Sequence, residues 1–213
     1  MIRIAHALLA LVLILGVDAL AAEPSGSLFL VAKPQLADPN FGQSVVLLTQ
    51  FGRLGSMGVI VNRPTGLALS RVFTDVKRLA QSDERFFFGG PVSRDVVLFV
   101  FRSPDQPDEA FEVLEGVYIS SDRELLKDLL GRDKPPEALR VFMGYAGWAA
   151  GQLEAEISRG DWEVVQADAK AIFAKKPEAL WPEFIRRASE TTVRGKPALV
   201  PAMTTMTGGM PWR

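Results

Sequence analysis

Apolar residues along the chain occur in short runs that are separated by polar or glycine-containing breaks. Many of these runs are rich in β-branched or aromatic side chains and end at glycine, proline or a charged residue, which is typical of strands. Five of them predict strands, at residues 26–34, 44–51, 56–64, 85–92 and 95–103. The second and third runs are separated by a short loop bounded by glycines, which predicts an antiparallel pair.

Other segments show helical spacing. Apolar residues recur at three- and four-residue steps in 67–79, which predicts a short amphipathic helix. Ser121 and Glu124 form a capping-box pattern before a leucine-rich face that ends at Gly131, which predicts a second helix. Further patterns predict a strand or short hairpin at 111–120, a strand at 161–165, and helices at 168–175 and 180–188.

Residues 140–162 contain an alternating apolar run, three spaced glycines and a helix-like segment. The glycine spacing matches neither a dinucleotide-binding fingerprint nor a P-loop. We expect Gly144 and Gly147 to permit a tight turn from strand to helix, and Gly151 to let the helix approach the sheet closely. The alternative is a small ligand or anion site at this corner, formed by Gly144, Tyr145, Gly147 and Trp148.

The pair Asn62-Arg63, followed by Pro64, is a second candidate ligand-binding site. An amide and a guanidinium at the end of a strand can grip a carboxylate. The competing interpretation, which we favour, is a turn that terminates the strand while Arg63 pairs on the surface.

The N-terminal residues predict export. Arg3 precedes an apolar run at 7–17, and Ala19-x-Ala21 follows as a cleavage signal, which is the layout of a secretory signal peptide. The run is shorter than the roughly 20 apolar residues of a membrane span, so we expect no stable membrane span after cleavage. We therefore expect a signal peptide at 1–21, one domain at 22–190 and a flexible tail at 191–213, with the mature protein in the periplasm.

Composition narrows the chemistry. The chain has 213 residues, a formal net charge of −1 and no basic stripe, so nucleic acid is disfavoured as a partner. It has no cysteine, and its one histidine, His6, lies in the predicted signal peptide. Catalytic triads that use histidine and metal sites that use sulfur are therefore excluded from the mature domain. We expect no cofactor and no catalytic site, while an enzyme that uses carboxylates or a hard metal ion stays open.

About seven strands and five helices, with hairpin-like pairs first and helices later, predict an α+β domain. Five segments are also similar in sequence, order and spacing to the YqgE/AlgH family. They are LVAKPQLADPNFGQSVVLLTQ, GSMGVIVNRP, FFFGGPV, GVYISSDRELL and GYAGWAAGQLEAEISRGDW. The resemblance covers about residues 27–185 and implies a single domain with a bent, barrel-like mixed or antiparallel sheet and helices packed around it.

The family resemblance implies no established enzyme activity. Relatives are usually cytoplasmic, which is the alternative to a periplasmic location, and the family's link to transcriptional regulation is a weaker functional alternative. Relatives commonly carry histidines where this chain has Phe51 and, near residue 101, another apolar residue. We therefore expect a non-enzymatic binding or interaction protein of the bacterial envelope, whose partner is a protein or a small anionic ligand.

Overall fold

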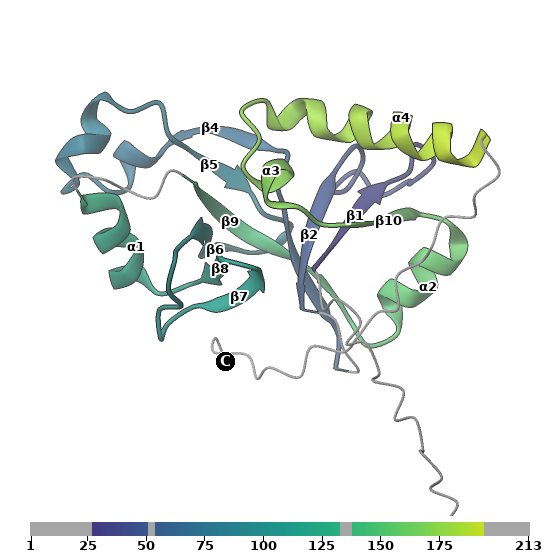
Figure 1. The fold of residues 1–213 in the computed structure, drawn as a ribbon, viewed down its shortest axis with the longest axis horizontal. Helices are drawn as coiled ribbons and strands as arrows, with labels where there is room; N and C mark the ends of the chain where they lie inside the picture. Colours follow the sequence, from purple (N-terminus) through teal and green to yellow (C-terminus); the bar gives the residue numbers. More distant parts are fainter. Residues whose placement is uncertain (1–26, 51–53, 133–137, 194–213) are drawn as a thin grey trace, which may run out of the picture.

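The computed structural model describes residues 27–50, 54–132 and 138–193. Within these residues, ten strands form one curled and mostly antiparallel sheet with helices packed around it, which confirms the predicted α+β fold (Figure 1). The strands are β1 (Leu28–Ala32), β2 (Val45–Gln50), β3 (Ser56–Ile60), β4 (Pro64–Ala68), β5 (Arg85–Phe88), β6 (Val92–Arg102), β7 (Phe111–Leu114), β8 (Val117–Ser120), β9 (Leu139–Trp148) and β10 (Trp162–Gln166).

Four α-helices and three 3₁₀ turns complete the described part of the chain. They are η1 (Leu69–Arg71), η2 (Lys77–Gln81), α1 (Arg123–Gly131), α2 (Gln152–Arg159), α3 (Ala169–Ile172), η3 (Pro177–Ala179) and α4 (Leu180–Val193). The last helix runs three residues past the predicted domain boundary at residue 190. The predicted signal peptide, Phe51 and the predicted tail beyond residue 193 lie outside the described residues.

Strand β9 joins the two halves of the sheet. Strand β6 pairs antiparallel along one side of it. On its other side, residues 141–143 pair in parallel with β5, and residues 146–148 pair antiparallel with β3. The full order is β10-β1-β2-β3-β9-β6-β8-β7, and β4 is attached through β5. The sheet therefore changes neighbours near Gly144, where the chain between β5 and β6 passes across β9.

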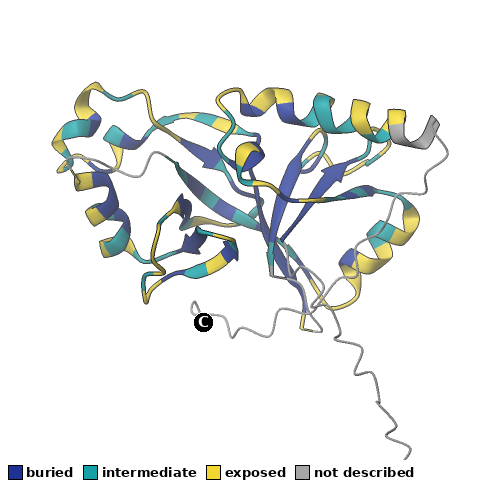
Figure 2. Ribbon diagram, viewed as in Figure 1, coloured by how far each residue is buried: buried dark blue, intermediate teal, exposed yellow. Residues whose placement is uncertain are grey.

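Alternating residues of each strand enter different cores. One sheet face carries Phe29, Leu47, Val100 and Phe142, which pack under α3 and α4 in a cluster that spans both halves. The opposite face is covered by α2 at one end and by α1, η1 and η2 at the other. Figure 2 shows this arrangement as dark blue strands beneath helices whose outer faces are exposed.

The structure confirms several elements predicted from the sequence. The antiparallel pair β2–β3 is present, and residues 111–120 form the hairpin β7–β8 rather than one strand. The predicted helix ending at Gly131 is α1, although the residue that caps its N-terminus differs from the predicted one. Asp122, rather than Ser121, is the N-cap, and its carboxylate accepts a hydrogen bond from Leu125 N at 2.7 Å.

The predicted helix at 67–79 is wrong. Residues 64–68 form strand β4, and two 3₁₀ turns follow it. Leu69, Phe73 and Leu79 are buried, as the apolar pattern requires, but they point into one core from irregular backbone. The physical reason is pairing with β5: Pro64 lies opposite Phe87 and Ala68 opposite Arg85, which keeps residues 64–68 extended.

Candidate functional site

Helices α3 and α4 cover part of one sheet face. A groove lies on the same face, just beyond the part that these helices cover. It lies beside β4 and the first residues of β5 and β9, and the segment between α3 and α4 closes one wall. Its volume is about 880 Å³. Fifteen residues line it: Pro64, Thr65, Gly66, Leu69, Ser82, Asp83, Glu84, Arg85, Phe87, Leu139, Arg140, Val141, Lys175, Pro177 and Glu178.

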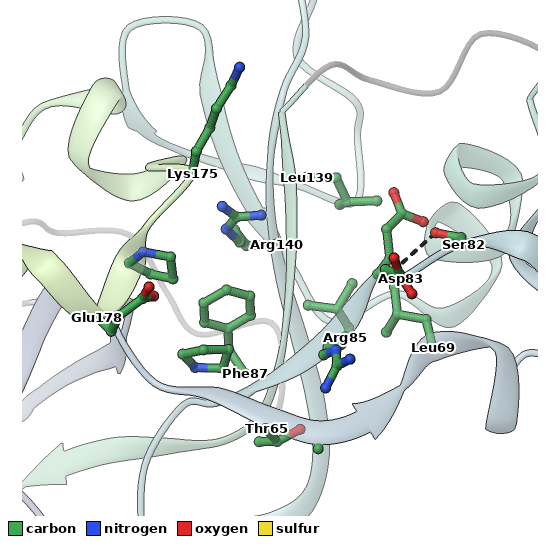
Figure 3. A pocket seen from close by; sticks show the side chains of 15 residues that line it. Thr65, Leu69, Ser82, Asp83, Arg85, Phe87, Leu139, Arg140, Lys175 and Glu178 are labelled. Atoms are coloured by element: carbon green, nitrogen blue, oxygen red, sulfur yellow. Dashed lines mark hydrogen bonds between the residues drawn. The ribbon is translucent and has the colours of Figure 1, made fainter.

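The parallel pairing of β5 with β9 brings two arginines together. In that register Phe86 lies opposite Val141 and Phe87 opposite Phe142. One step earlier, Arg85 therefore lies next to Arg140. Both arginines are on the same sheet face as Phe87, because side chains alternate along a strand. Figure 3 shows Arg140 above the Phe87 ring, with Arg85 toward one side.

Arg140 is the half-buried cation of this groove. Its guanidinium carbon lies 4.9 Å from the centre of the Phe87 ring, in cation–π range. Its Nη2 donates to Ala174 O at 2.7 Å, which ties β9 to the segment after α3. Its Nε is fully buried and has no hydrogen-bond partner among the described residues. The guanidinium is therefore held in place, and its Nη1 makes no hydrogen bond within the described part of the chain.

The surroundings of Arg140 also change its acid–base properties. Burial lowers the pKa of Arg140, because removing water disfavours the charged form, and the nearby carboxylate of Glu84 opposes that shift. The Glu84 carboxylate is itself held by Arg78, at 2.9 Å. Arg140 therefore keeps its charge at ordinary pH, but in a setting where an additional anion would compensate lost hydration.

The remaining charged groups of the groove carry both signs and are exposed. Arg85 and Lys175 make no hydrogen bond or ion pair through their side chains within the described part of the chain, and the same holds for Asp83 and Glu178. In Figure 3, Lys175 lies beyond Arg140, Asp83 lies on one side and Glu178 on the other. The groove thus offers two free cations and two free carboxylates around one fixed arginine.

Two hydroxyl groups also line the groove, and both are already used by the backbone. Thr65 Oγ1 donates to Phe86 O at 2.8 Å and accepts from Leu67 N at 3.1 Å. Ser82 Oγ accepts from Glu84 N at 3.1 Å. Neither hydroxyl lies against a basic partner that would activate it as a nucleophile.

The sequence-predicted residues Asn62 and Arg63 support the strand ends. Asn62 is buried, and its Oδ1 accepts from Val45 N at 2.8 Å while its Nδ2 donates to Gln43 O at 3.0 Å. The guanidinium of Arg63 donates to the carbonyls of Asn40 and Gly42. Burial lowers the pKa of Arg63, and Asp38 opposes that shift. Both side chains are therefore engaged by the loop before β2, and ligand binding by them stays a prediction.

The glycine-rich corner differs from the predicted turn. Gly144 and Gly147 lie inside strand β9, which continues to Trp148 before the chain turns. A Cβ built on Gly144 would lie 2.6 Å from Gly90 O, so this glycine permits the crossing chain to approach. Gly151 is the N-cap of α2 with φ of 75°, and nothing lies within 4 Å of its would-be Cβ. It allows a left-handed backbone rather than close packing.

The two aromatic residues of that corner have separate roles. Trp148 is buried, and its Nε1 donates to Glu156 Oε2 at 2.8 Å, so the indole contributes to packing under α2. Tyr145 is half-buried and packs against the cluster beneath α4. The corner residues and Asn62-Arg63 do not line the groove, although Pro64 and Thr65 continue directly into it.

Sequence reasoning missed Arg85, Phe87, Arg140 and Lys175 as a group. A usable signal was present: β5 begins with an arginine, β9 has one at its second residue, and both continue as an apolar run. Their meeting depends on a parallel pair between distant segments, whereas the sequence pattern suggested hairpins. Side chains that could hold a metal ion do not gather in threes among the residues that the structure describes. In the same residues, none of the helices has the length and apolar character needed to cross a membrane.

Comparison with known proteins gives consistent matches. The family described as AlgH-like matches residues 29–192. A UPF0301 protein of Streptomyces coelicolor is 40% identical over 167 residues, covering 74% of this chain and 83% of that protein. A UPF0301 protein of Myxococcus xanthus is 36% identical over 184 residues, covering 85% of this chain and 95% of that protein.

Solved structures share the fold. The solution structure of the AlgH protein from Pseudomonas aeruginosa has 30% sequence identity and a TM-score of 0.65, covering 83% of this chain and 96% of that chain. The crystal structure of protein DIP2367 from Corynebacterium diphtheriae has a TM-score of 0.64 and 24% identity, covering 86% and 93%. At that identity the second match shows the fold alone.

Proposed function

This chain belongs to the AlgH-like family, and from that premise we propose that it is a non-enzymatic protein that binds a small anionic ligand in the groove around Arg140. One observation supports this proposal most strongly. Arg140 is held by Phe87 and Ala174 O in a groove of about 880 Å³, and its Nη1 makes no hydrogen bond within the described part of the chain.

Preorganisation makes this arginine a suitable anchor. A guanidinium presents planar donors that match a carboxylate or phosphate, and the cost of ordering its side chain is already met by the contacts within the protein. A hydrogen bond to a charged group contributes about 1.5–3 kcal/mol, more than a neutral one. Arg85, next to it in the strand register, adds a second positive charge on the same sheet face.

Binding is favoured over catalysis by the chemistry of the groove. The Thr65 and Ser82 hydroxyls are committed to backbone partners, and the Asp83 and Glu178 carboxylates are exposed. An exposed carboxylate lacks the burial that tunes a catalytic acid or base toward neutral pH. The groove therefore contains groups that hold and orient a ligand, without a pair of groups arranged for proton transfer.

We place this binding protein in the bacterial envelope as part of the same proposal. The support is the N-terminal sequence, in which Arg3, the apolar run at 7–17 and Ala19-x-Ala21 have the order of a signal peptide. In the periplasm the ligand would be an anionic metabolite or cell-envelope component.

Isothermal titration calorimetry of the purified protein with glutarate and with inorganic phosphate tests the proposal. We expect at least one of these anions to bind, and Arg140→Gln to weaken its binding by about tenfold or more, the equivalent of 1.4 kcal/mol. Arg159→Gln is the matched control, because Arg159 is exposed on α2 and, within the described residues, pairs with Asp161 alone. Equal affinity in wild type and Arg140→Gln, or no binding of either anion, would overturn the proposal.

A further inference from the structure

Arg140 is flanked by unpaired side chains of both signs, and this points to a more specific ligand (Figure 3). We infer that the ligand carries a carboxylate and an ammonium group together, as a short peptide with free ends does. This inference rests on the proposed function, since it assigns the carboxylate to the Arg140 anchor. The ammonium group would then be held by Glu178 or by Asp83, which lie on opposite sides of Arg140 (Figure 3).

The pairing of the acidic groups supports this assignment. Of the three carboxylates that line the groove, Glu84 is paired with Arg78 at 2.9 Å. Asp83 precedes β5, and Glu178 lies in η3 on the facing wall. Neither has a hydrogen-bond or ion-pair partner within the described part of the chain. Two carboxylates are thus available to a positively charged group.

Electrostatic complementarity then selects among ligand classes. A purely anionic ligand would gain from Arg140, Arg85 and Lys175 but would lie close to two unpaired carboxylates. A purely cationic ligand would meet three positive side chains. A ligand with both charges can pair with Arg140 and with one of the unpaired carboxylates, and like-charge contacts against the other two classes provide discrimination.

Size and the apolar lining favour a peptide over a single amino acid. The volume of about 880 Å³ lies in the upper part of the range of roughly 300–1,000 Å³ that is usual for small-molecule sites. Leu69, Phe87, Val141 and Pro177 also line the groove. They provide apolar contacts for short side chains, while the carboxylate end of the peptide reaches Arg140 and the ammonium end reaches Glu178 or Asp83.

A set of capped peptides tests the inference. The purified protein is titrated with trialanine, N-acetyl-trialanine, trialanine amide and glutarate. We expect trialanine to bind most tightly, the acetylated form several-fold more weakly and the amide about tenfold more weakly, because one ionic contact is lost in each case. In the double variant Asp83→Asn with Glu178→Gln, acetylation should no longer matter. The control variant Glu154→Gln, on the exposed face of α2, should keep the preference.

The outcomes separate this inference from the proposed function. If glutarate binds through Arg140 and acetylation of the peptide makes no difference, the ligand is an anion only, and the inference is overturned while the proposed function stands. If neither glutarate nor phosphate binds, the proposed function fails, and the inference that rests on it fails with it. If trialanine binds best but the double variant keeps the same preference, the ammonium is held elsewhere and the assignment to Asp83 and Glu178 is wrong.

Discussion

At the scale of single residues, Glu156 connects three elements through one carboxylate. Its Oε2 accepts the indole N–H of Trp148 at 2.8 Å and that of Trp162 at 2.9 Å. Phe41 stacks on the Trp148 ring at 5.8 Å and meets the Trp162 ring edge-on at 5.6 Å. One acidic side chain on α2 therefore fixes the ends of β9 and β10 and the aromatic cluster between them.

Replacing this carboxylate should destabilise the fold. In Glu156→Gln the neutral amide oxygen is a weaker acceptor for two indoles, so we expect the free energy of unfolding to fall by about 1–3 kcal/mol. The midpoint of urea denaturation measures the change. Glu154→Gln, on the same helix but exposed, should change it by less than about 0.5 kcal/mol. Equal effects of the two substitutions would show that the indole contacts contribute little.

Tyr118 provides a pH-dependent test of the hairpin region. Burial, followed by the charges of Glu112 and Asp105, raises the pKa of Tyr118 above its ordinary value of about 10. The native state then keeps a proton that the unfolded chain releases. The contribution to stability is therefore present below about pH 10 and is lost as the pH rises through the native pKa.

Ultraviolet titration of tyrosinate measures this shift directly. The chain has two tyrosines, so in Tyr145→Phe the signal comes from Tyr118 alone. We expect its midpoint to lie at higher pH in the native protein than in the same variant unfolded in urea. Identical midpoints would contradict the burial of Tyr118 against acidic neighbours.

At the scale of elements, sequence patterns predicted the helices and strands whose conformation depends on neighbouring residues. The β-branched runs became β2 and β3, and the leucines before Gly131 became the buried face of α1. Residues 67–79 were predicted as a helix because their apolar spacing is helical. Pairing of β4 with β5 is a longer-range interaction, and it determines the backbone there instead. The same apolar residues are buried in either case.

The segment that contains Gly90 passes very close to the backbone of Tyr145 in β9, and this contact can be tested by substitution. A Cβ built on Gly90 would lie 2.1 Å from the backbone carbon of Tyr145, whereas nothing lies within 4 Å of one built on Gly66. We expect Gly90→Ala to lower the free energy of unfolding by more than about 4 kcal/mol, or to prevent folding. Gly66→Ala should change it by about 1 kcal/mol or less. Yield of soluble protein and urea denaturation compare the two, and a well-folded Gly90→Ala variant would contradict the described crossing.

At the scale of the whole molecule, the sheet topology creates the groove. Residues at the starts of β5 and β9 are far apart in sequence and meet only because those strands run parallel. Alternation along each strand can be read from the sequence. The sequence pattern does not show which strands pair with each other, so Arg85 and Arg140 were not predicted to be neighbours. Lys175 and Glu178 join them through the turn between α3 and α4, which has no periodic signal.

The proposed envelope location has its own test. Fractionation of the native cells and the mass of the purified chain should give a periplasmic protein that begins near Ala22, because Ala19-x-Ala21 precedes that residue. A chain that begins at Met1 in the cytoplasm would refute export. It would leave the groove proposal intact but would direct the search for a ligand to cytoplasmic anions.

The central claim is that a ligand binds in the groove around Arg140, and not at the glycine corner. Nuclear magnetic resonance of the nitrogen-15-labelled protein, titrated with glutarate, tests it most directly. The groove account predicts that the shifted amide signals will cluster at Phe87, at 139–141 and at 175–178, and that Arg140→Gln will strongly reduce these shifts at the same glutarate concentration. Shifts centred on Asn62-Arg63 and on 144–148, or the same groove shifts in the Arg140→Gln variant, would contradict it.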